Sequence, residues 1–240
     1  MRRLAALLLC TALAAPMAQA QDFTEEEIKQ LALQAILENP QIVMDAVAIL
    51  QQREAEEAEA QAQATLGESR DLLERDPNAP VLGNPEGDVT VVEFFDYNCP
   101  YCRRAGGEVE KLLEADSNVR VVYREWPILG EGSVFAARAA LAARAQDKYG
   151  EMHEALMGAR GRLDEASVMQ IAAEIGLDVE KLRADMDAPE VQAHIDTTMQ
   201  LAQSLGFSGT PSFVIGDARA PGLIDAEQMQ QIVEETRAAN

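Results

Sequence analysis

Apolar residues recur at helical spacing through residues 24–75, the first long zone of the chain. Thr24 followed by Glu27 has the pattern of a capping box, in which the two residues satisfy each other's backbone N–H groups. The spacing predicts one helix that ends at Asn39-Pro40 and a second helix that begins near Pro40. The second helix passes into a run of Gln, Glu and Ala, residues 51–64, with almost no large apolar side chain.

That polar run cannot bury itself alone, so the helical segment over residues 21–75 has two interpretations, and both stay open. One is an arm folded back on its own globular domain. The other is an oligomerisation segment, or stalk, whose apolar stripe packs on copies of itself. Turn-rich residues 76–88 then mark the boundary of the next domain.

From residue 89 the pattern changes to short apolar runs that alternate with helical segments. Strands are predicted over residues 89–95, 119–125 and 212–215. A helix from Cys99 to about Ala115 joins the first two strands, and a strand, helix and strand in this order build a parallel sheet. Residues 131–205 are helical in pattern throughout. We therefore expect an α/β domain over residues 76–240 that contains an inserted all-helical subdomain.

Residues 1–20 have the pattern of a secretory signal peptide. Two arginines follow Met1, an apolar stretch runs from Leu4 to Ala15, and small residues precede a cleavage site after Ala20. The apolar stretch is shorter than the roughly 20 residues that cross a bilayer. We expect the mature protein to be soluble and exported.

The charge balance is strongly acidic, with 41 Asp and Glu against 20 Lys and Arg, a formal net charge of −21. Removal of the two signal arginines would make the mature chain more acidic still. Such a chain is repelled by nucleic acids and by anionic membranes, so neither is expected as a partner.

Three cysteines are present, and Cys10 lies within the signal peptide. The other two form the motif Cys99-Pro100-Tyr101-Cys102, directly after the apolar strand 89–95. The opening turn of a helix favours a thiolate through its unpaired N–H groups and the positive end of its dipole. Cys99 is therefore the predicted nucleophile. Cys102, one turn further on, is the predicted resolving thiol that attacks a mixed disulfide on Cys99.

This redox chemistry needs no cofactor, and no metal site is predicted from the rest of the sequence. His153 and His194 are the only histidines, and both are interpreted as ordinary residues of the helical insert. An alternative from another class is a copper-handling protein, in which the thiolates of Cys99 and Cys102 hold a soft Cu(I) ion.

Four motifs in this order resemble those of the disulfide-exchange proteins of the DsbA family, within the thioredoxin superfamily. They are EFFDYNCPYC at residues 93–102, AARAAL at 136–141, GRLD at 161–164 and GTPSFVIG at 209–216. In the helical segment, LENPQIV at residues 37–43 is similar to the N-terminal segment of the suppressor-of-copper-sensitivity C proteins. In some of those relatives, the segment makes trimers.

The resemblance implies a thioredoxin fold with Pro211 in the cis form, facing the two cysteines. Thr210 and Pro211 would then hold an extended substrate strand through backbone groups, and Pro100 and Tyr101 would contact the substrate as well. Glu93 matches the buried acid of the family, which would accept the proton of Cys102. The alternative for Glu93 is an exposed glutamate at a strand edge.

Two positions set the expected direction of the reaction. Tyr101 stands where the strongly oxidising members carry histidine, and tyrosine supplies no charge there to stabilise the Cys99 thiolate, so a moderate reduction potential is expected. A threonine before the proline, as at Thr210, is more similar to the isomerase branch of the family than to the dedicated oxidants. The resemblance therefore implies a periplasmic disulfide isomerase or reductase that acts on misfolded or misoxidised exported proteins.

Such an isomerase would be reduced by a membrane thiol–disulfide electron donor. It would also form a homo-oligomer, for example a trimer. Two alternatives remain open. One is a DsbA-type dithiol oxidase that introduces disulfides, and the other is the copper(I)-binding protein of a copper-tolerance system.

Overall fold

The computed structural model of the chain describes residues 23–239, so the predicted signal peptide over residues 1–20 lies outside the described residues. The chain divides into two compact units, and the boundary along the sequence falls between Glu54 and Ala55. Within residues 23–239, no helix combines the length and the apolar composition that a membrane crossing requires.

The first unit contains helix α1 (Glu25–Glu38) and the beginning of helix α2 (Gln41–Glu68). The predicted capping box is confirmed, because the Thr24 N–H donates to the Glu27 carboxylate at 2.9 Å and the Glu27 N–H donates to Thr24 Oγ1 at 3.3 Å. The break at Asn39-Pro40 is confirmed as well. The apolar side chains of α1 are not buried by their own unit.

The second unit is built on a five-stranded mixed sheet in the order β1-β3-β2-β4-β5. The strands are β1 (Val81–Gly83), β2 (Val89–Phe95), β3 (Val119–Glu125), β4 (Ser212–Ile215) and β5 (Ala218–Pro221). Strands β2 and β3 are parallel, as predicted, and the other neighbouring pairs are antiparallel. Because β2 lies in the centre of the sheet, it is covered on both faces, and all of its residues except Thr90 and Glu93 are apolar.

The two faces of the sheet form two separate cores. On one face, Val121 and Tyr123 of β3 share a cluster with residues of α4 (Pro100–Ala115) and α10 (Ala226–Ala239). On the other face, Val122 packs with Phe94 and Trp126 against α9 (Pro189–Ser204). The alternation of side chains along a strand produces this division.

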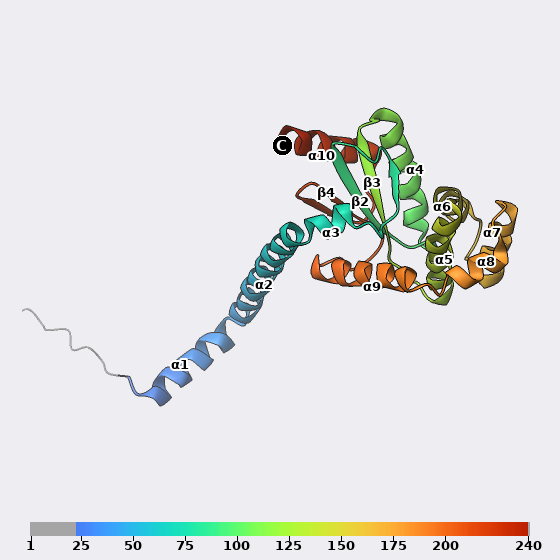
Figure 1. Cartoon of the computed structure of the whole chain (residues 1–240). Coiled ribbons are helices and arrows are strands. Elements are labelled where there is room, and N and C mark those ends of the chain that lie inside the picture. The colour runs from blue at the N-terminus through green and yellow to red at the C-terminus, as the bar shows by residue number, and fades with distance from the viewer. Residues whose placement is uncertain (1–22, 240) are drawn as a thin grey trace, which may run out of the picture. The chain divides into compact units, whose positions relative to one another are not determined.

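The helices between β3 and β4 correspond to the insert predicted over residues 131–205 (Figure 1). They are α5 (Glu131–Ala142), a 3-10 turn (Ala143–Gln146), α6 (Tyr149–Gly158), α7 (Glu165–Glu174), α8 (Val179–Asp185) and α9. Ala136, Ala139 and Ala140 of α5 are fully buried. Their small side chains allow the neighbouring helices to approach closely.

The second half of α2 and helix α3 (Arg70–Arg75) belong to the second unit, although the sequence places a boundary at residues 75–76. Leu66 and Leu73 are almost completely buried in the core of the second sheet face. Arg124 of β3 donates to the carbonyls of Leu72 and Leu73, which fixes α3 at its C-terminal end. Residues 55–75 are therefore part of the second unit and contribute to its core.

Candidate active site

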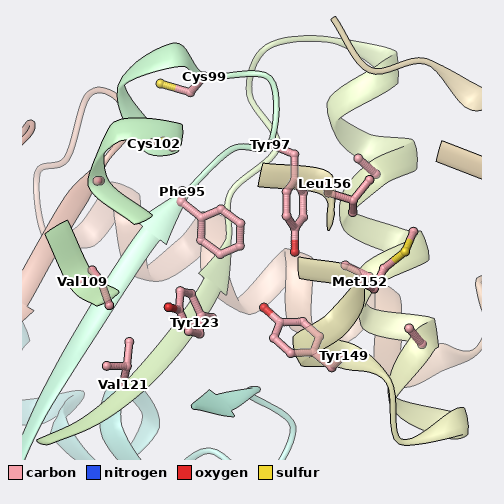
Figure 2. Close-up of a cluster of buried hydrophobic side chains, with 14 of the residues drawn as sticks. Phe95, Tyr97, Cys99, Cys102, Val109, Val121, Tyr123, Tyr149, Met152 and Leu156 are labelled. Atoms are coloured by element: carbon pink, nitrogen blue, oxygen red, sulfur yellow. The ribbon is translucent and has the colours of Figure 1, made fainter. Parts of the chain in front are cut away.

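The two cysteines lie where β2 ends and α4 begins, as predicted. Cys99 is the N-cap of α4, and Pro100 occupies the first helical position. Figure 2 shows both cysteines in the first turn of α4, with Phe95 and Tyr97 beneath them. The two cysteines are not joined in a disulfide, and Cys102 is fully buried one turn behind Cys99.

The surroundings of the two thiols separate their pKa values widely. Hydrogen bonds from the Cys102 thiol and from the N–H groups of Tyr101 and Cys102 lower the pKa of Cys99 to about 5, although burial opposes this shift. Burial raises the pKa of Cys102 far above its usual range, and its hydrogen bond to Cys99 and the charge of Glu93 add to the effect. At neutral pH, Cys99 is a thiolate and Cys102 a thiol.

Thr210 and Pro211 face Cys99, and their peptide bond is cis, which confirms the expectation from the resemblance. Cys99 Sγ lies 3.3 Å from the backbone oxygen of Thr210. Tyr101 is 56% exposed, and Pro100 is exposed as well. Of the four residues expected to contact a substrate, Thr210 and Pro211 lie beside the nucleophile, and Pro100 and Tyr101 are exposed on the surface next to it.

Glu93 is completely buried on the central strand β2, between Tyr123 of β3 and Phe213 of β4. This position excludes the alternative of an exposed glutamate at a strand edge. Neither carboxyl oxygen has a hydrogen-bond partner within the described residues. Burial raises the pKa of Glu93 to about 8, and the charge of the Cys99 thiolate contributes to the shift.

Asn98, directly before the nucleophile, is a site residue that sequence reasoning missed. Its side chain accepts a hydrogen bond from the Leu163 N–H at 2.7 Å and donates to the Leu163 carbonyl at 3.2 Å. It also donates to Ser133 Oγ at 3.2 Å. A Cβ at Gly132 would lie 2.1 Å from the Leu163 carbonyl, so only glycine permits this close approach. These contacts fix the active-site loop to the helical insert.

Both histidines lie in helices of the insert, as interpreted from the sequence, and both also take part in buried polar contacts. The Tyr97 hydroxyl lies 3.1 Å from His153 Nδ1, and burial lowers the pKa of His153 to about 4, so its ring is neutral. His194 Nε2 lies 2.7 Å from Glu125 at the end of β3. The Tyr149 hydroxyl donates to the same carboxylate at 2.6 Å. These contacts tie the insert to the sheet.

Across the part of the chain that the structure describes, no three His, Cys, Asp or Glu side chains are grouped so that they could hold a metal ion.

Comparisons with known proteins point to one family. The sequence model of the DSBA-like thioredoxin domain matches residues 90–234. A solved thioredoxin-like oxidoreductase from Silicibacter pomeroyi DSS-3 is 66% identical, covers 71% of this chain and 99% of its own, and has a TM-score of 0.71. A linker-deletion mutant of ScsC from Proteus mirabilis is 28% identical, covers 95% of this chain and 100% of its own, and has a TM-score of 0.69.

A curated relative has a different overall length. The Na⁺/H⁺ antiporter NhaA 1 of Salinispora arenicola is 32% identical over 179 residues, which are 72% of this chain but 28% of the antiporter. The chain therefore spans a minor part of that relative.

Proposed function

This chain belongs to the DSBA-like thioredoxin domain family, and on that premise we propose that it is a thiol–disulfide oxidoreductase that rearranges wrongly paired disulfides. The family and the thioredoxin fold expected from the four sequence motifs are confirmed. The observation that best supports the proposed activity is the difference in pKa and in burial between the two thiols. Cys99 has a pKa of about 5 and adjoins the Thr210 carbonyl, whereas Cys102 is buried with a raised pKa.

The first step uses the Cys99 thiolate. It attacks one sulfur of a substrate disulfide, so that a Cys99–substrate disulfide forms and the other substrate sulfur leaves as a thiolate. In isomerisation, a different substrate thiolate then attacks the substrate sulfur of that mixed disulfide and releases Cys99 as a thiolate. No net oxidation or reduction of the enzyme occurs in this cycle.

The second route uses Cys102 and reduces the substrate. Cys102 attacks Cys99 in the mixed disulfide, the Cys99–Cys102 disulfide forms, and the substrate leaves with its thiol. Cys102 must first lose its proton, and Glu93 is the proposed acceptor. Once Cys99 is bonded to substrate its negative charge is gone, so one cause of the raised pKa of Glu93 disappears and the carboxylate becomes available as a base.

Substrate polypeptide is proposed to bind along Thr210 and Pro211. A backbone contact at this position pairs with an extended strand whatever its side chains are, which suits an enzyme with many clients. Pro100 and Tyr101 are the proposed side-chain contacts. Tyr101 itself supplies no positive charge to Cys99, in contrast to a histidine at that position, and this difference favours a moderate potential and hence isomerisation.

Recovery of ribonuclease activity from scrambled disulfides in a glutathione buffer tests the proposal. The mature chain from residue 21 is expected to restore activity, Cys99→Ser to abolish it, and Cys102→Ser to keep part of it, because isomerisation needs only the first thiol. If the mature chain fails on scrambled ribonuclease but oxidises the reduced form, the isomerase proposal is wrong.

A dithiol oxidase is the second candidate, and the low pKa of Cys99 favours it. A stabilised thiolate stabilises the reduced enzyme, which makes the disulfide more oxidising. The reduction potential, measured against glutathione, decides between the two: values near that of protein disulfide isomerase, about −180 mV, favour isomerisation, and values near that of DsbA, about −120 mV, favour oxidation.

The setting of the reaction is proposed on the same premise. The protein would act in the periplasm on misfolded or misoxidised exported proteins and would receive electrons from a membrane thiol–disulfide donor. The first unit leaves the apolar side chains of α1 and of the first half of α2 exposed. This exposure supports the association of several copies of the chain, for example as a trimer. Several sites around one client would raise the local enzyme concentration.

A further inference from the structure

Positive charge gathers beside Cys99 in a chain that is acidic overall. Four arginines, Arg103, Arg104, Arg160 and Arg162, form what we call the arginine rim. Carboxylates outnumber Lys and Arg by 41 to 20 in the sequence. Even so, none of the four rim arginines forms an ion pair within residues 23–239, whereas Arg138, Arg183 and Arg237 each hold a carboxylate.

Hydrogen bonds bring the rim together at the active-site loop. Arg103 lies one turn after Cys99, donates to the Tyr97 carbonyl at 3.3 Å and donates to the Gly161 carbonyl at 2.8 Å. The second bond brings its guanidinium to the backbone of Gly161, which Arg160 and Arg162 flank in the sequence.

Arg162 continues the rim on the other side of the loop. It donates to the Leu129 carbonyl, and the Leu129 N–H donates to Asp96 at 2.9 Å, three residues before the nucleophile. Arg104 follows Arg103 on α4. Arg104 and Arg160 are exposed, and within the described residues neither guanidinium has a hydrogen-bond partner. The charge of Arg104 contributes to the lowered pKa of Glu108, one turn further along α4, so Arg160 is the more available of the two for another molecule.

We propose that the arginine rim binds an acidic segment next to the reacting cysteine of a polypeptide partner; this rests on the proposed thiol–disulfide exchange at Cys99. At physiological ionic strength, charges interact over about 8 Å, so a peptide at Cys99 responds to the rim rather than to the net charge of the chain. An anionic membrane surface is a poorer fit, because the acidic remainder of the chain would repel it. The arginine rim would thus give the site a preference for acidic substrates, which the backbone contact at Thr210 does not supply.

Exchange rates with matched peptides test the proposal on the full mature chain. Three short peptides carry one cysteine as a mixed disulfide with thionitrobenzoate, flanked by Asp and Glu, by Ser and Gly, or by Lys. The Cys99 thiolate forms a disulfide with the peptide sulfur, and the coloured thionitrobenzoate thiolate leaves. Since an exposed ion pair changes a rate by about 2- to 5-fold, the acidic peptide is expected to react roughly 5-fold faster than the basic one. In about 1 M salt, the ratio should fall towards one.

Charge reversals locate the effect. Arg104→Glu and Arg160→Glu are each expected to lower the acidic-to-basic rate ratio by about 2-fold or more. Arg75→Glu is the matched control. Arg75 is exposed, forms no ion pair within the described residues, and lies near Arg120, which is at the opposite end of the parallel strands from Cys99. It carries the same change of net charge and should leave the ratio unchanged.

The possible failures are distinguishable. Equal rates for the three peptides, or an equal loss of preference in Arg75→Glu, would overturn the arginine rim and leave the exchange activity standing. If no peptide releases thionitrobenzoate, the proposed function fails together with the rim.

Discussion

At the residue scale, the reactivity of Cys99 depends on the position of its backbone as well as on its own side chain. The N–H groups that lower its pKa belong to Tyr101 and Cys102 in the first turn of α4. Their direction is set by the loop that enters the helix. Asn98 holds that loop to Leu163 and Ser133 of the insert, so it is a positioning residue for the nucleophile.

Asn98→Ala is therefore expected to raise the pKa of Cys99 by about one unit, because the loop gains freedom and the thiolate loses aligned donors. Thiolate absorbance against pH measures this value. Asn84→Ala is the control, since Asn84 accepts one turn hydrogen bond from the Glu86 N–H at 3.0 Å, before β2 rather than after it. A variant that is less stable but keeps the Cys99 pKa near 5 would show that Asn98 has only a structural role.

The burial of Glu93 is expected to make the stability of the protein depend on pH. Its pKa is raised from 4.5 to about 8 in the folded protein, so between these pH values the native state keeps a proton that the unfolded chain has lost. Stability from this group therefore falls as pH rises through that window. Glu93→Gln removes the titration, so its free energy of unfolding relative to wild type should rise across the window, by up to about 5 kcal/mol.

Urea unfolding at a series of pH values measures the difference. Glu110→Gln on the exposed side of α4 is the matched control and should show no such trend. A difference between Glu93→Gln and wild type that stays constant with pH would contradict a neutral buried carboxyl. The same variant should slow resolution of the mixed disulfide by Cys102, if Glu93 takes its proton.

At the element scale, the strands that position the site are those whose sequences are most distinctive. The bounds predicted for β2, β3 and β4 agree with the structure, because each strand carries several buried β-branched or aromatic residues between turn-rich segments. The edge strands β1 and β5 were not predicted. They have three and four residues, none fully buried, and so carry no apolar run to detect.

The contacts between elements were the least predictable part. Asn98 and Leu163 are 65 residues apart, and Tyr97 and His153 are 56 apart, so only the folded topology brings each pair together. The periodicity of the insert marks His153 as a helix residue and carries no information about its partner.

The attachment of α2 was hidden for a different reason. Its Gln-, Glu- and Ala-rich run over residues 51–64 buries only Ala62, and the one large buried side chain of α2, Leu66, lies just beyond that run. Leu66→Ala is expected to destabilise the second unit by about 2–5 kcal/mol, because it leaves a cavity in the core beside Phe94.

Leu72→Ala in the neighbouring α3 is the matched control, since Leu72 is 44% exposed and its truncation should cost about 0.5 kcal/mol or less. Urea denaturation of both variants measures the two values. Equal losses would mean that Leu66 does not belong to the folded core.

At the scale of the whole molecule, the division between Glu54 and Ala55 determines where the chain can be cut. A chain that begins at Asp76 loses Leu66 and Leu73, which belong to the same buried cluster as Phe94. It also loses the ion pair between Glu59 and Arg219. We expect it to be strongly destabilised, so a loss of isomerase activity in that chain would say nothing about oligomerisation.

A chain that begins at Ala55 retains these contacts and removes only the first unit. It should unfold near the temperature of the mature chain and should still oxidise reduced ribonuclease, because every residue of the candidate site remains. If residues 23–54 associate copies, light scattering will give a single-chain mass for the shorter protein and a multiple of that mass for the mature one. Isomerase activity on scrambled ribonuclease should then be lost with the oligomer. A mature protein with the mass of one chain would instead leave the apolar side chains of α1 without a second copy to cover them, and the dithiol oxidase would become the better interpretation.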